Sequence, residues 1–304
     1  MRRFTVITFV MALFSALFAE GATVNIPDSG LKAAIQDSYL AQVGTPLGNP
    51  PTDTELANPL FQILQARGRS ITDLTGIQAC TSLTQAFLGQ NLIDDTQAAK
   101  VLSLTALQYL DFGTGDIENE PLEDPGDFNN DITDVTPFAA LPNLIFFNVA
   151  GNPNLTTLSG IETFPSLQFI LLGRNGSTSA AFYAPLTTMT TLAGIYVGFG
   201  GLTDATLAAI AASNDLQYVL VPGNELTTLS GLANETLLNV IWATYNRITD
   251  ITALANKTQL ATVALDYNRL RDVTPLLNNN AIGGDDTVSV GANPLRNSAY
   301  CNQL

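Results

Sequence analysis

The sequence predicts an α/β solenoid, in which a parallel β-sheet lines the concave face of a curved horseshoe and a helical cap covers its N-terminal end. Three observations lead to this prediction. A pattern of apolar residues with one asparagine recurs at a basic period of 22 residues, as between Asn246 and Asn268. Each copy alternates apolar with other residues just before the asparagine, which is typical of a short strand. No copy can bury its own apolar residues, so the copies must stack into coils.

The recurring pattern is L-x-x-L-x-L-x-x-N-x-L, which is typical of a leucine-rich repeat solenoid. One copy consists of Leu238, Ile241, Ala243, Asn246 and Ile248. Its asparagine position is occupied along the chain by Arg69, Asn91, Gly115, Asn152, Asn175, Gly200, Asn224, Asn246, Asn268 and Asn293. We therefore predict about ten coils across residues 61–296, with the apolar columns in one continuous core. Each buried apolar side chain would contribute about 1.5–3 kcal/mol to that core.

The polar positions of the repeat have predicted structural roles. Buried asparagine amides can bond the backbone of adjacent coils, whereas Gly115 and Gly200 cannot, so we expect irregular structure at these two coils. An aspartate follows many of the strands. We expect it to cap the free N–H groups of the return segment rather than to act in catalysis. These aspartates are Asp73, Asp134, Asp204, Asp250 and Asp272.

The flanks of the repeat array differ from it in composition. Residues 22–60 are predicted to form a helical N-terminal cap, with a helix that begins after Asp28 or Ser29 and ends at Gly44. Thr52 or Asp53 would open a second short helix through Leu56. Residues 297–304 form a short C-terminal end. This end would leave the last coil partly uncovered, and packing of coil ends into filaments is therefore one functional alternative.

Residues 1–21 resemble a secretory signal peptide. Arg2 and Arg3 precede the uninterrupted apolar run from Phe4 to Ala19. That run is shorter than the roughly 20 residues that a spanning helix needs, although a retained N-terminal anchor is the alternative interpretation. We therefore expect a secreted or cell-surface protein that does not insert into a membrane once the signal is removed.

Composition excludes several classes of function. The 304 residues carry a net charge of −15, which disfavours nucleic acid and anionic membranes as partners. The chain has no histidine, which removes the commonest general base and most zinc chemistry. We expect no enzymatic activity, no cofactor and no metal, although the acidic loop 116–131 could bind calcium as an alternative to being simply solvated. Cys80 and Cys301 are expected to be unpaired, because eight strand spacings of about 4.8 Å separate them.

Aromatic residues gather at the positions of the repeat that face the concave side. They are Phe87, Tyr109, Phe146, Phe169, Tyr196, Phe199, Tyr218, Trp242, Tyr245 and Tyr267. Leu171 and Leu220 join them, with Asp111, Arg174 and Asp266 as the few charges. Strands favour aromatic residues, and rings on neighbouring strands pack together, which is one explanation. The alternative is a ligand-binding surface, because a contiguous exposed apolar patch usually marks an interaction site.

Three stretches resemble secreted bacterial leucine-rich repeat proteins of the internalin type. They are the cap "VNIPDSGLKAAI", the repeat "ITDLTGIQACTSLTQAFLGQN" and the ending "GGDDTVSVGANPL". The resemblance implies an extracellular, non-enzymatic binding or adhesion protein that uses its concave sheet. We expect a protein partner, with a glycan on the same face as the alternative. Coil lengths vary between 22 and 37 residues and no sorting motif is present, so surface attachment and host-cell invasion are not carried over.

Overall fold

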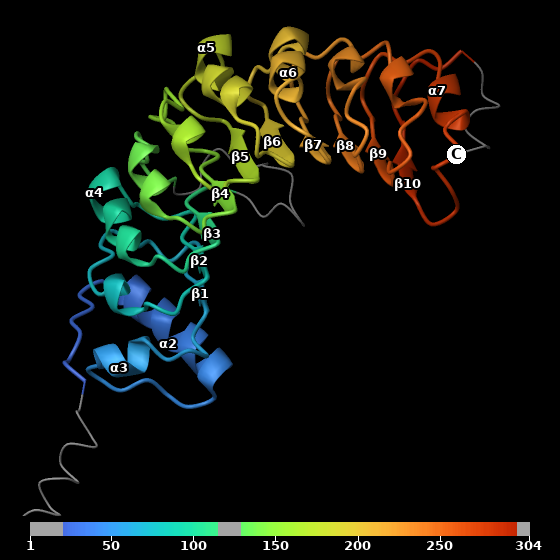
Figure 1. Cartoon of the computed structure of the whole chain (residues 1–304). Coiled ribbons are helices and arrows are strands. Elements are labelled where there is room, and N and C mark those ends of the chain that lie inside the picture. The colour runs from blue at the N-terminus through green and yellow to red at the C-terminus, as the bar shows by residue number, and fades with distance from the viewer. Residues whose placement is uncertain (1–20, 115–128, 297–304) are drawn as a thin grey trace, which may run out of the picture.

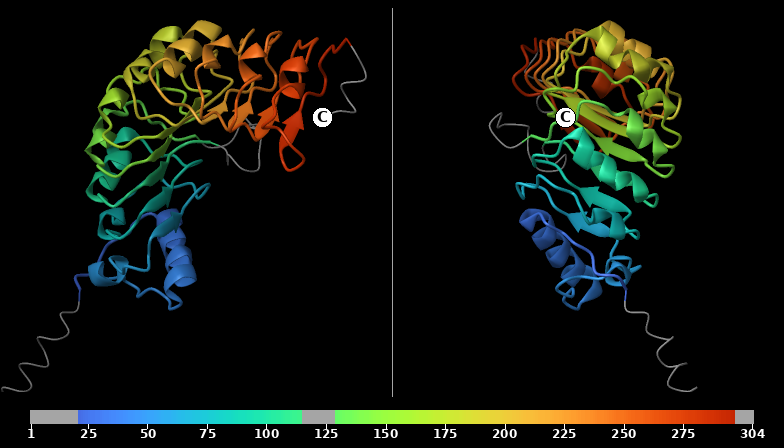
Figure 2. Two further views of the ribbon diagram at one scale, coloured as in Figure 1. Left: turned by 45° about the vertical axis from the view of Figure 1, so that its right-hand side comes forward. Right: turned by 90° about the vertical axis from the view of Figure 1, so that its left-hand side faces the viewer.

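The computed structural model describes residues 21–114 and 129–296, and the chain forms an arched α/β solenoid (Figure 1). A parallel sheet lines the inner side of the arch, and short helices lie on the outer side, as the further views in Figure 2 also show. The ten strands pair in chain order, each with its sequence neighbours. This is the predicted leucine-rich repeat architecture, and it is confirmed.

The strands are short because each coil turns away after crossing the sheet once. They are β1 Ile63–Gln65, β2 Gln85–Phe87, β3 Tyr109–Asp111, β4 Phe146–Asn148, β5 Phe169–Gly173, β6 Gly194–Gly198, β7 Tyr218–Leu220, β8 Val240–Trp242, β9 Thr262–Ala264 and β10 Thr287–Ser289.

The return segments contain short helices. The α-helices in the described chain are α2 Ser29–Val43, α3 Asp53–Leu56, α4 Asp95–Ala98, α5 Ala180–Tyr183, α6 Asp204–Ala211 and α7 Thr274–Leu277. The 3-10 helices are η1 Ile77–Ala79, η2 Ala99–Ser103, η3 Thr136–Ala140, η4 Ile161–Thr163, η5 Ala184–Thr188, η6 Ser230–Leu232 and η7 Thr252–Leu254.

Helix α2 covers the first strand and follows the predicted bounds. The Asp28 carboxylate accepts a hydrogen bond from the Leu31 N–H, and Gly44 ends the helix in the left-handed conformation. The Gln42 side chain accepts from the Ile63 N–H at 2.9 Å and donates to the Ile63 carbonyl at 2.6 Å. Side chains of the helix therefore satisfy the edge of β1 that would otherwise be open to pairing with another chain.

The apolar core runs through every coil as predicted. The middle residue of each three-residue strand from β1 to β9 points inward and is at most 1% exposed, as Leu64 and Ile241 illustrate. In the longer strands β5 and β6 the second and fourth residues take this place. The residues on either side of it point to the concave face. This alternation fixes which side chains the inner curve can offer to a partner.

A ladder of asparagines joins the coils after the strands. The Asn246 amide donates to carbonyls of Val221 and Ala243, and its oxygen accepts from the Leu226 N–H. Asn91, Asn152, Asn224, Asn268 and Asn293 make equivalent contacts. The role predicted for these amides is confirmed. Asn175, also predicted to be buried there, is half-buried, and its oxygen accepts from the Asn152 N–H.

Two coils depart from the ladder, each in its own way. Asn130, rather than Gly115, supplies the amide in one of them, donating to carbonyls of Leu88 and Phe112 at 2.9 Å. In the other, the buried Tyr183 hydroxyl donates to the Gly200 carbonyl at 2.7 Å. A Cβ at Gly200 would lie 2.3 Å from that hydroxyl, so the tyrosine occupies the space of the missing asparagine side chain.

A second polar ladder joins the C-terminal coils before the strands. The buried Glu235 carboxylate accepts from the Leu216 N–H at 2.7 Å, and the buried Lys257 ammonium donates to carbonyls of Leu232 and Ala233. Burial raises the pKa of Glu235 and lowers that of Lys257. Repeat matching did not predict this ladder, because its members are of three residue types: Glu235 and Lys257 lie between the asparagines Asn214 and Asn279.

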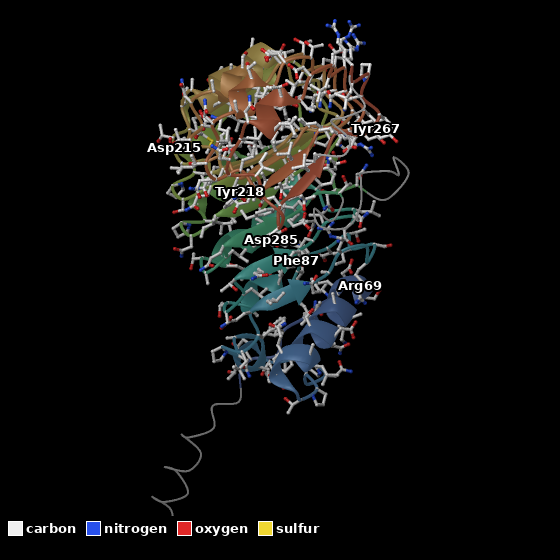
Figure 3. The ribbon with its side chains drawn as sticks, turned by 90° about the vertical axis from the view of Figure 1, so that its right-hand side faces the viewer. Arg69, Phe87, Asp215, Tyr218, Tyr267 and Asp285 are labelled. Carbon is white, nitrogen blue, oxygen red and sulfur yellow. The ribbon has the colours of Figure 1, made fainter. Side chains whose placement is uncertain are left out.

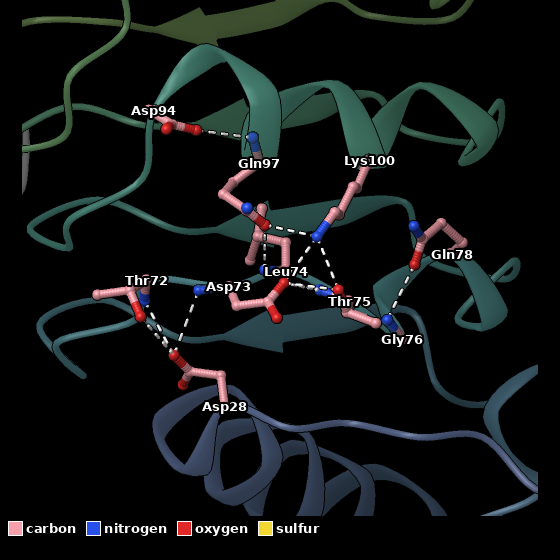
Figure 4. A network of polar contacts seen from close by, with 10 residues as sticks. All are labelled: Asp28, Thr72, Asp73, Leu74, Thr75, Gly76, Gln78, Asp94, Gln97 and Lys100. Atoms are coloured by element: carbon pink, nitrogen blue, oxygen red, sulfur yellow. Dashed lines mark hydrogen bonds and ion pairs between the residues drawn. The ribbon is translucent and has the colours of Figure 1, made fainter.

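The aspartate caps follow the prediction in four cases. Asp134, Asp250 and Asp272 each accept from the N–H two residues later. Asp73 does the same with Thr75, and the Lys100 ammonium contacts its carboxylate at 2.6 Å (Figure 4). The prediction is wrong for Asp204. Its carboxylate binds the backbone and hydroxyl of Thr227 in the next coil.

Several predictions fall outside the described residues. Residues 1–20 of the expected signal, residues 115–128 of the region that holds the acidic loop, and residues 297–304 with Cys301 are among them. Cys80 is buried and unpaired, and burial raises the pKa of its thiol to about 12. No helix within the described part of the chain is long and apolar enough to cross a membrane.

Candidate binding surface on the concave face

The predicted aromatic residues lie in three columns along the inner curve. Parallel register places Tyr109 beside Phe146 and Phe169 in the first column. It places Leu171 beside Tyr196, and Leu220 beside Trp242, in the second. The third column is the position before the ladder asparagine. We call the ten residues Phe87, Tyr109, Phe146, Phe169, Tyr196, Phe199, Tyr218, Trp242, Tyr245 and Tyr267 the concave aromatic face.

Rings of the first column form a nearly continuous row. Tyr109 stacks on Phe146 with centroids 4.1 Å apart, and the ring of Phe87, from the second column, lies tilted against Tyr109 at 4.7 Å. Phe169 continues the row at 6.3 Å from Phe146, then contacts Tyr218 at 5.8 Å. Contacts at these separations stabilise the sheet, so packing between strands accounts for part of this row.

A hollow interrupts the row at Gly194. The register aligns Gly194 with Phe169 on one side and Tyr218 on the other, so the intervening strand contributes no side chain there. A hollow of about 190 Å³ lies at this point, lined by apolar residues that include Phe146, Leu171, Tyr196 and Leu220. A Cβ at Gly194 would come within 2.6 Å of the Phe169 ring, so glycine is what leaves this space open.

The third column carries its large side chains on strained backbone. Phe199, Tyr245 and Tyr267 have φ of 51°, 55° and 55°, in the left-handed region that bulky residues rarely adopt. They are exposed by 43%, 55% and 53%. Gly223 occupies the same position in the coil between Phe199 and Tyr245, and a Cβ there would meet the Phe199 ring at 2.3 Å. Figure 3 shows Tyr267 and Asp215 on opposite sides of the inner curve.

Trp242 and Tyr196 lie half-buried in the second column rather than beneath the coils. The Trp242 indole N–H donates to the Thr244 hydroxyl at 2.8 Å, which fixes the ring against the sheet. Burial raises the pKa of Tyr196, and the Arg174 charge acts in the opposite direction. Leu171 is only 5% exposed, so the expectation that it adds open surface is wrong.

The few charges of the inner curve contact neighbouring groups. Asp111, which we expected on the open face, is fully buried and bonds the Arg67 guanidinium and the Gly113 N–H. Burial raises the pKa of Asp111 to about 6, although Arg67 acts to lower it. Asp266 accepts from the Ser289 hydroxyl and the Gly291 N–H. The Arg174 guanidinium lies 4.9 Å from the centre of the Phe199 ring.

The arrangement of these residues suits binding of a partner better than catalysis. Within residues 21–114 and 129–296, no three Cys, Asp or Glu residues come close enough to hold a metal ion. The two acids named above lie in β3 and after β9, six coils apart in the sheet order. What the inner curve offers is rings, a hollow and little charge. The hollow and the strained third column were not predicted, although glycine at 194 in an aromatic column is a signal that could have indicated the first.

Comparisons with known proteins support the fold. No known family profile matches the sequence, and no curated protein matches it. Solved structures do match. Internalin C2 of Listeria monocytogenes is 22% identical over 89% of this chain and 98% of its own, with a TM-score of 0.53. The internalin inlF of the same organism is 23% identical over 95% of this chain and 83% of its own, with a TM-score of 0.60. The chain therefore has an internalin-like leucine-rich repeat fold.

Proposed function

We propose that this chain is a secreted, non-enzymatic recognition protein that binds a protein partner through the concave aromatic face. The single observation that carries the proposal is the third column. Exposed rings at Phe199, Tyr245 and Tyr267 stand on backbone that costs about 1 kcal/mol or more per residue. The left-handed backbone itself belongs to the repeat, since Gln90, Arg174 and Ala292 adopt it at the same position in other coils. What folding does not require there is a large exposed ring, so the three rings support a role in binding.

The hollow at Gly194 supports a protein partner more than a glycan. Its lining consists of rings and aliphatic side chains, which suits an apolar side chain inserted from a partner. Sugars need polar groups that bond their hydroxyls, and the second column around the hollow supplies Leu171 and Leu220 instead. A glycan remains the second candidate, favoured by rings such as Trp242, whose faces could stack on a sugar.

The remaining predictions agree with this proposal. The apolar segment within residues 1–21 supports export, and we place the protein outside the cell or on its surface. The absence of histidine and the separation of the concave acids support a non-enzymatic role. The net charge of −15 disfavours nucleic acid as a partner.

The test is affinity capture with matched variants. The purified chain, its Trp242→Ala variant and its Leu237→Ala variant would be immobilised and exposed to surface proteins of its native environment and to a glycan array. Leu237 is an exposed apolar residue off the concave face, so it controls for the loss of any exposed hydrophobic side chain. We expect wild type and Leu237→Ala to capture the same protein. Trp242→Ala should bind that protein at least about 30-fold more weakly, because it loses an anchor residue of the interface.

Two outcomes would contradict the proposal. Equal binding by all three proteins, with thermal melts showing each of them folded, would remove the concave face as the site. Binding confined to glycans, with the same dependence on Trp242, would keep the site but replace the protein partner with a carbohydrate.

A further inference from the structure

Basic residues concentrate at one edge of the C-terminal coils. The whole chain has twelve, and four of them follow the last ladder asparagines: Arg247, Arg269, Arg271 and Arg296. We call these four the arginine row. The other eight lie elsewhere in a chain that carries 27 aspartates and glutamates. A basic cluster in such a chain is a local reversal of charge rather than part of a general trend.

The backbone places the row on neighbouring coils. The Arg269 N–H donates to the Ile248 carbonyl, beside Arg247, and the Arg296 N–H donates to the Arg271 carbonyl at 3.2 Å. Arg247 and Arg269 occupy the same repeat position one coil apart, directly after Asn246 and Asn268. Coils are about 4.8 Å apart and residues i and i+2 of extended chain about 7 Å apart, so the four side chains start from a compact grid.

Most of this positive charge is not neutralised within the described chain. Arg247 pairs with Glu225 at 3.2 Å, in an exposed contact. Arg269, Arg271 and Arg296 are exposed and, within residues 21–114 and 129–296, have no carboxylate within 4.0 Å. Three guanidinium groups are therefore available to an external anion, and their planar donors suit carboxylates.

The row adjoins the third aromatic column. Tyr245 and Tyr267 precede Arg247 and Arg269 by two residues each, and their exposed rings stack on one another. Figure 3 shows Tyr267 at the margin of the inner curve. A ligand that crosses this margin would meet rings first and guanidinium groups next.

We propose that the arginine row and the Tyr245–Tyr267 pair bind a short acidic peptide segment of the protein partner. This inference rests on the proposed function and adds a charge requirement to it. Carboxylates of the segment would pair with Arg269, Arg271 and Arg296, and its apolar part would lie on the tyrosines toward the concave aromatic face. The nearby acids Glu225 and Asp272 limit the anion to a short stretch, which disfavours an extended polyanion such as a nucleic acid.

The test uses a defined probe and two triple variants. A fluorescein-labelled peptide of six glutamates and a tyrosine is titrated with the full chain at low and high salt, with the matching hexaglutamine peptide as control. The first variant is Arg269→Gln/Arg271→Gln/Arg296→Gln. The second, Thr81→Glu/Thr105→Glu/Thr190→Glu, lowers the net charge by the same three units at exposed positions that precede strands β2, β3 and β6.

We expect the acidic peptide alone to bind, with affinity that falls as salt rises. The arginine variant should bind at least about tenfold more weakly, because it loses charge-assisted hydrogen bonds, and the threonine variant should resemble wild type. No binding, or equal weakening in both variants, would overturn the inference. Tighter binding of a sulfated glycan than of the peptide to the same arginines would also overturn it.

The two proposals can fail separately. Capture of a partner through Trp242 with no effect of the arginine variant would contradict only the charge requirement. Peptide binding through the arginines, with partner capture indifferent to Trp242, would contradict only the concave site.

Discussion

Tyr245 and Tyr267 stack face to face with ring centroids 4.4 Å apart and planes 7° from parallel, although both residues hold left-handed backbone. The stacking of such a pair is worth about 0.5–1.5 kcal/mol. The backbone strain costs about 1–2 kcal/mol for each residue. The strain of the two residues together exceeds the stacking, so the pair does not explain the stability of the C-terminal coils. Its position at an exposed margin points to contact with a ligand.

Replacing both tyrosines with glycine should therefore leave stability almost unchanged. Glycine adopts the left-handed conformation without strain, so the variant relieves the backbone. It also loses the stacking and adds the conformational entropy cost of two glycines, about 0.5–1 kcal/mol each, which together offset most of that relief. We expect the free energy of unfolding, measured by urea denaturation, to change by less than about 2 kcal/mol. Ile241→Ala, which truncates a buried residue of β8, should cost about 2–5 kcal/mol in the same assay. A loss in the glycine variant as large as that of Ile241→Ala would assign the rings a structural role.

The sequence predicts the fold well because each coil of the solenoid corresponds to one period of the repeat. The spacing of asparagines such as Asn246 and Asn268 sets the coil length, and the alternation around Ile241 sets which side chains reach the inner curve. The irregular coils were harder. The repeat aligns Gly115 with the ladder, but Asn130 supplies the ladder amide. The 22-residue template does not say where the extra residues of a longer coil are inserted.

The positions of the residues on the candidate surface were predictable from the repeat, but the contacts between their side chains were not. The three columns follow from the repeat, and all ten aromatic residues lie on them. Burial of Asp111 does not follow, because its partner Arg67 lies 44 residues away and reaches past Gly89 of the coil between them. A contact between residues two coils apart needs a small residue in the coil between them. The repeat pattern does not specify where such small residues occur.

Asp111 should make stability depend on pH. Its pKa is raised from 3.8 to about 6 by burial, so between these values the folded state holds a proton that the unfolded state has released. The stabilising contribution of this group is complete below about pH 4 and is lost as the pH rises through about 6. The loss is about 3 kcal/mol at the order-of-magnitude level.

Asp111→Asn is the matched variant for that prediction, because it keeps the shape and cannot ionise. The difference in unfolding free energy, wild type minus variant, should fall between pH 4 and pH 7. Urea denaturation at intervals of half a pH unit measures it. A difference that stays constant, or that rises with pH, would show that the ion pair with Arg67 outweighs burial.

The ion pair of Lys100 with Asp73 should give stability the opposite pH dependence to that of Asp111. Its ammonium and the Thr75 hydroxyl lower the pKa of Asp73 to about 2, so the stabilisation is present above pH 3.8 and is lost as the pH falls toward 2. Lys100→Met should lower the melting temperature at pH 7 and have little effect at pH 2. The Asp73 side chain is 35% exposed, so solvent screening limits the effect at pH 7 to about 1 kcal/mol. Equal destabilisation at both pH values would show that Lys100 acts through packing alone.

Tyr183 and Gly200 form a compensating pair that a double-mutant cycle can test. Tyr183→Phe removes the hydroxyl that donates to the buried Gly200 carbonyl, and an unsatisfied buried acceptor costs about 1–3 kcal/mol. Gly200→Asn alone should also destabilise, because its Cβ would meet that hydroxyl at 2.3 Å. The double variant removes the hydroxyl, which is the nearest obstruction, and supplies the amide that other coils carry at this position. The Cγ1 of Val197, 2.8 Å from the new Cβ, must still shift slightly. We expect it to be more stable than either single variant, with a coupling energy of at least about 1 kcal/mol from chemical denaturation. Additive losses would mean that the tyrosine fills space at this coil without standing in for the ladder asparagine.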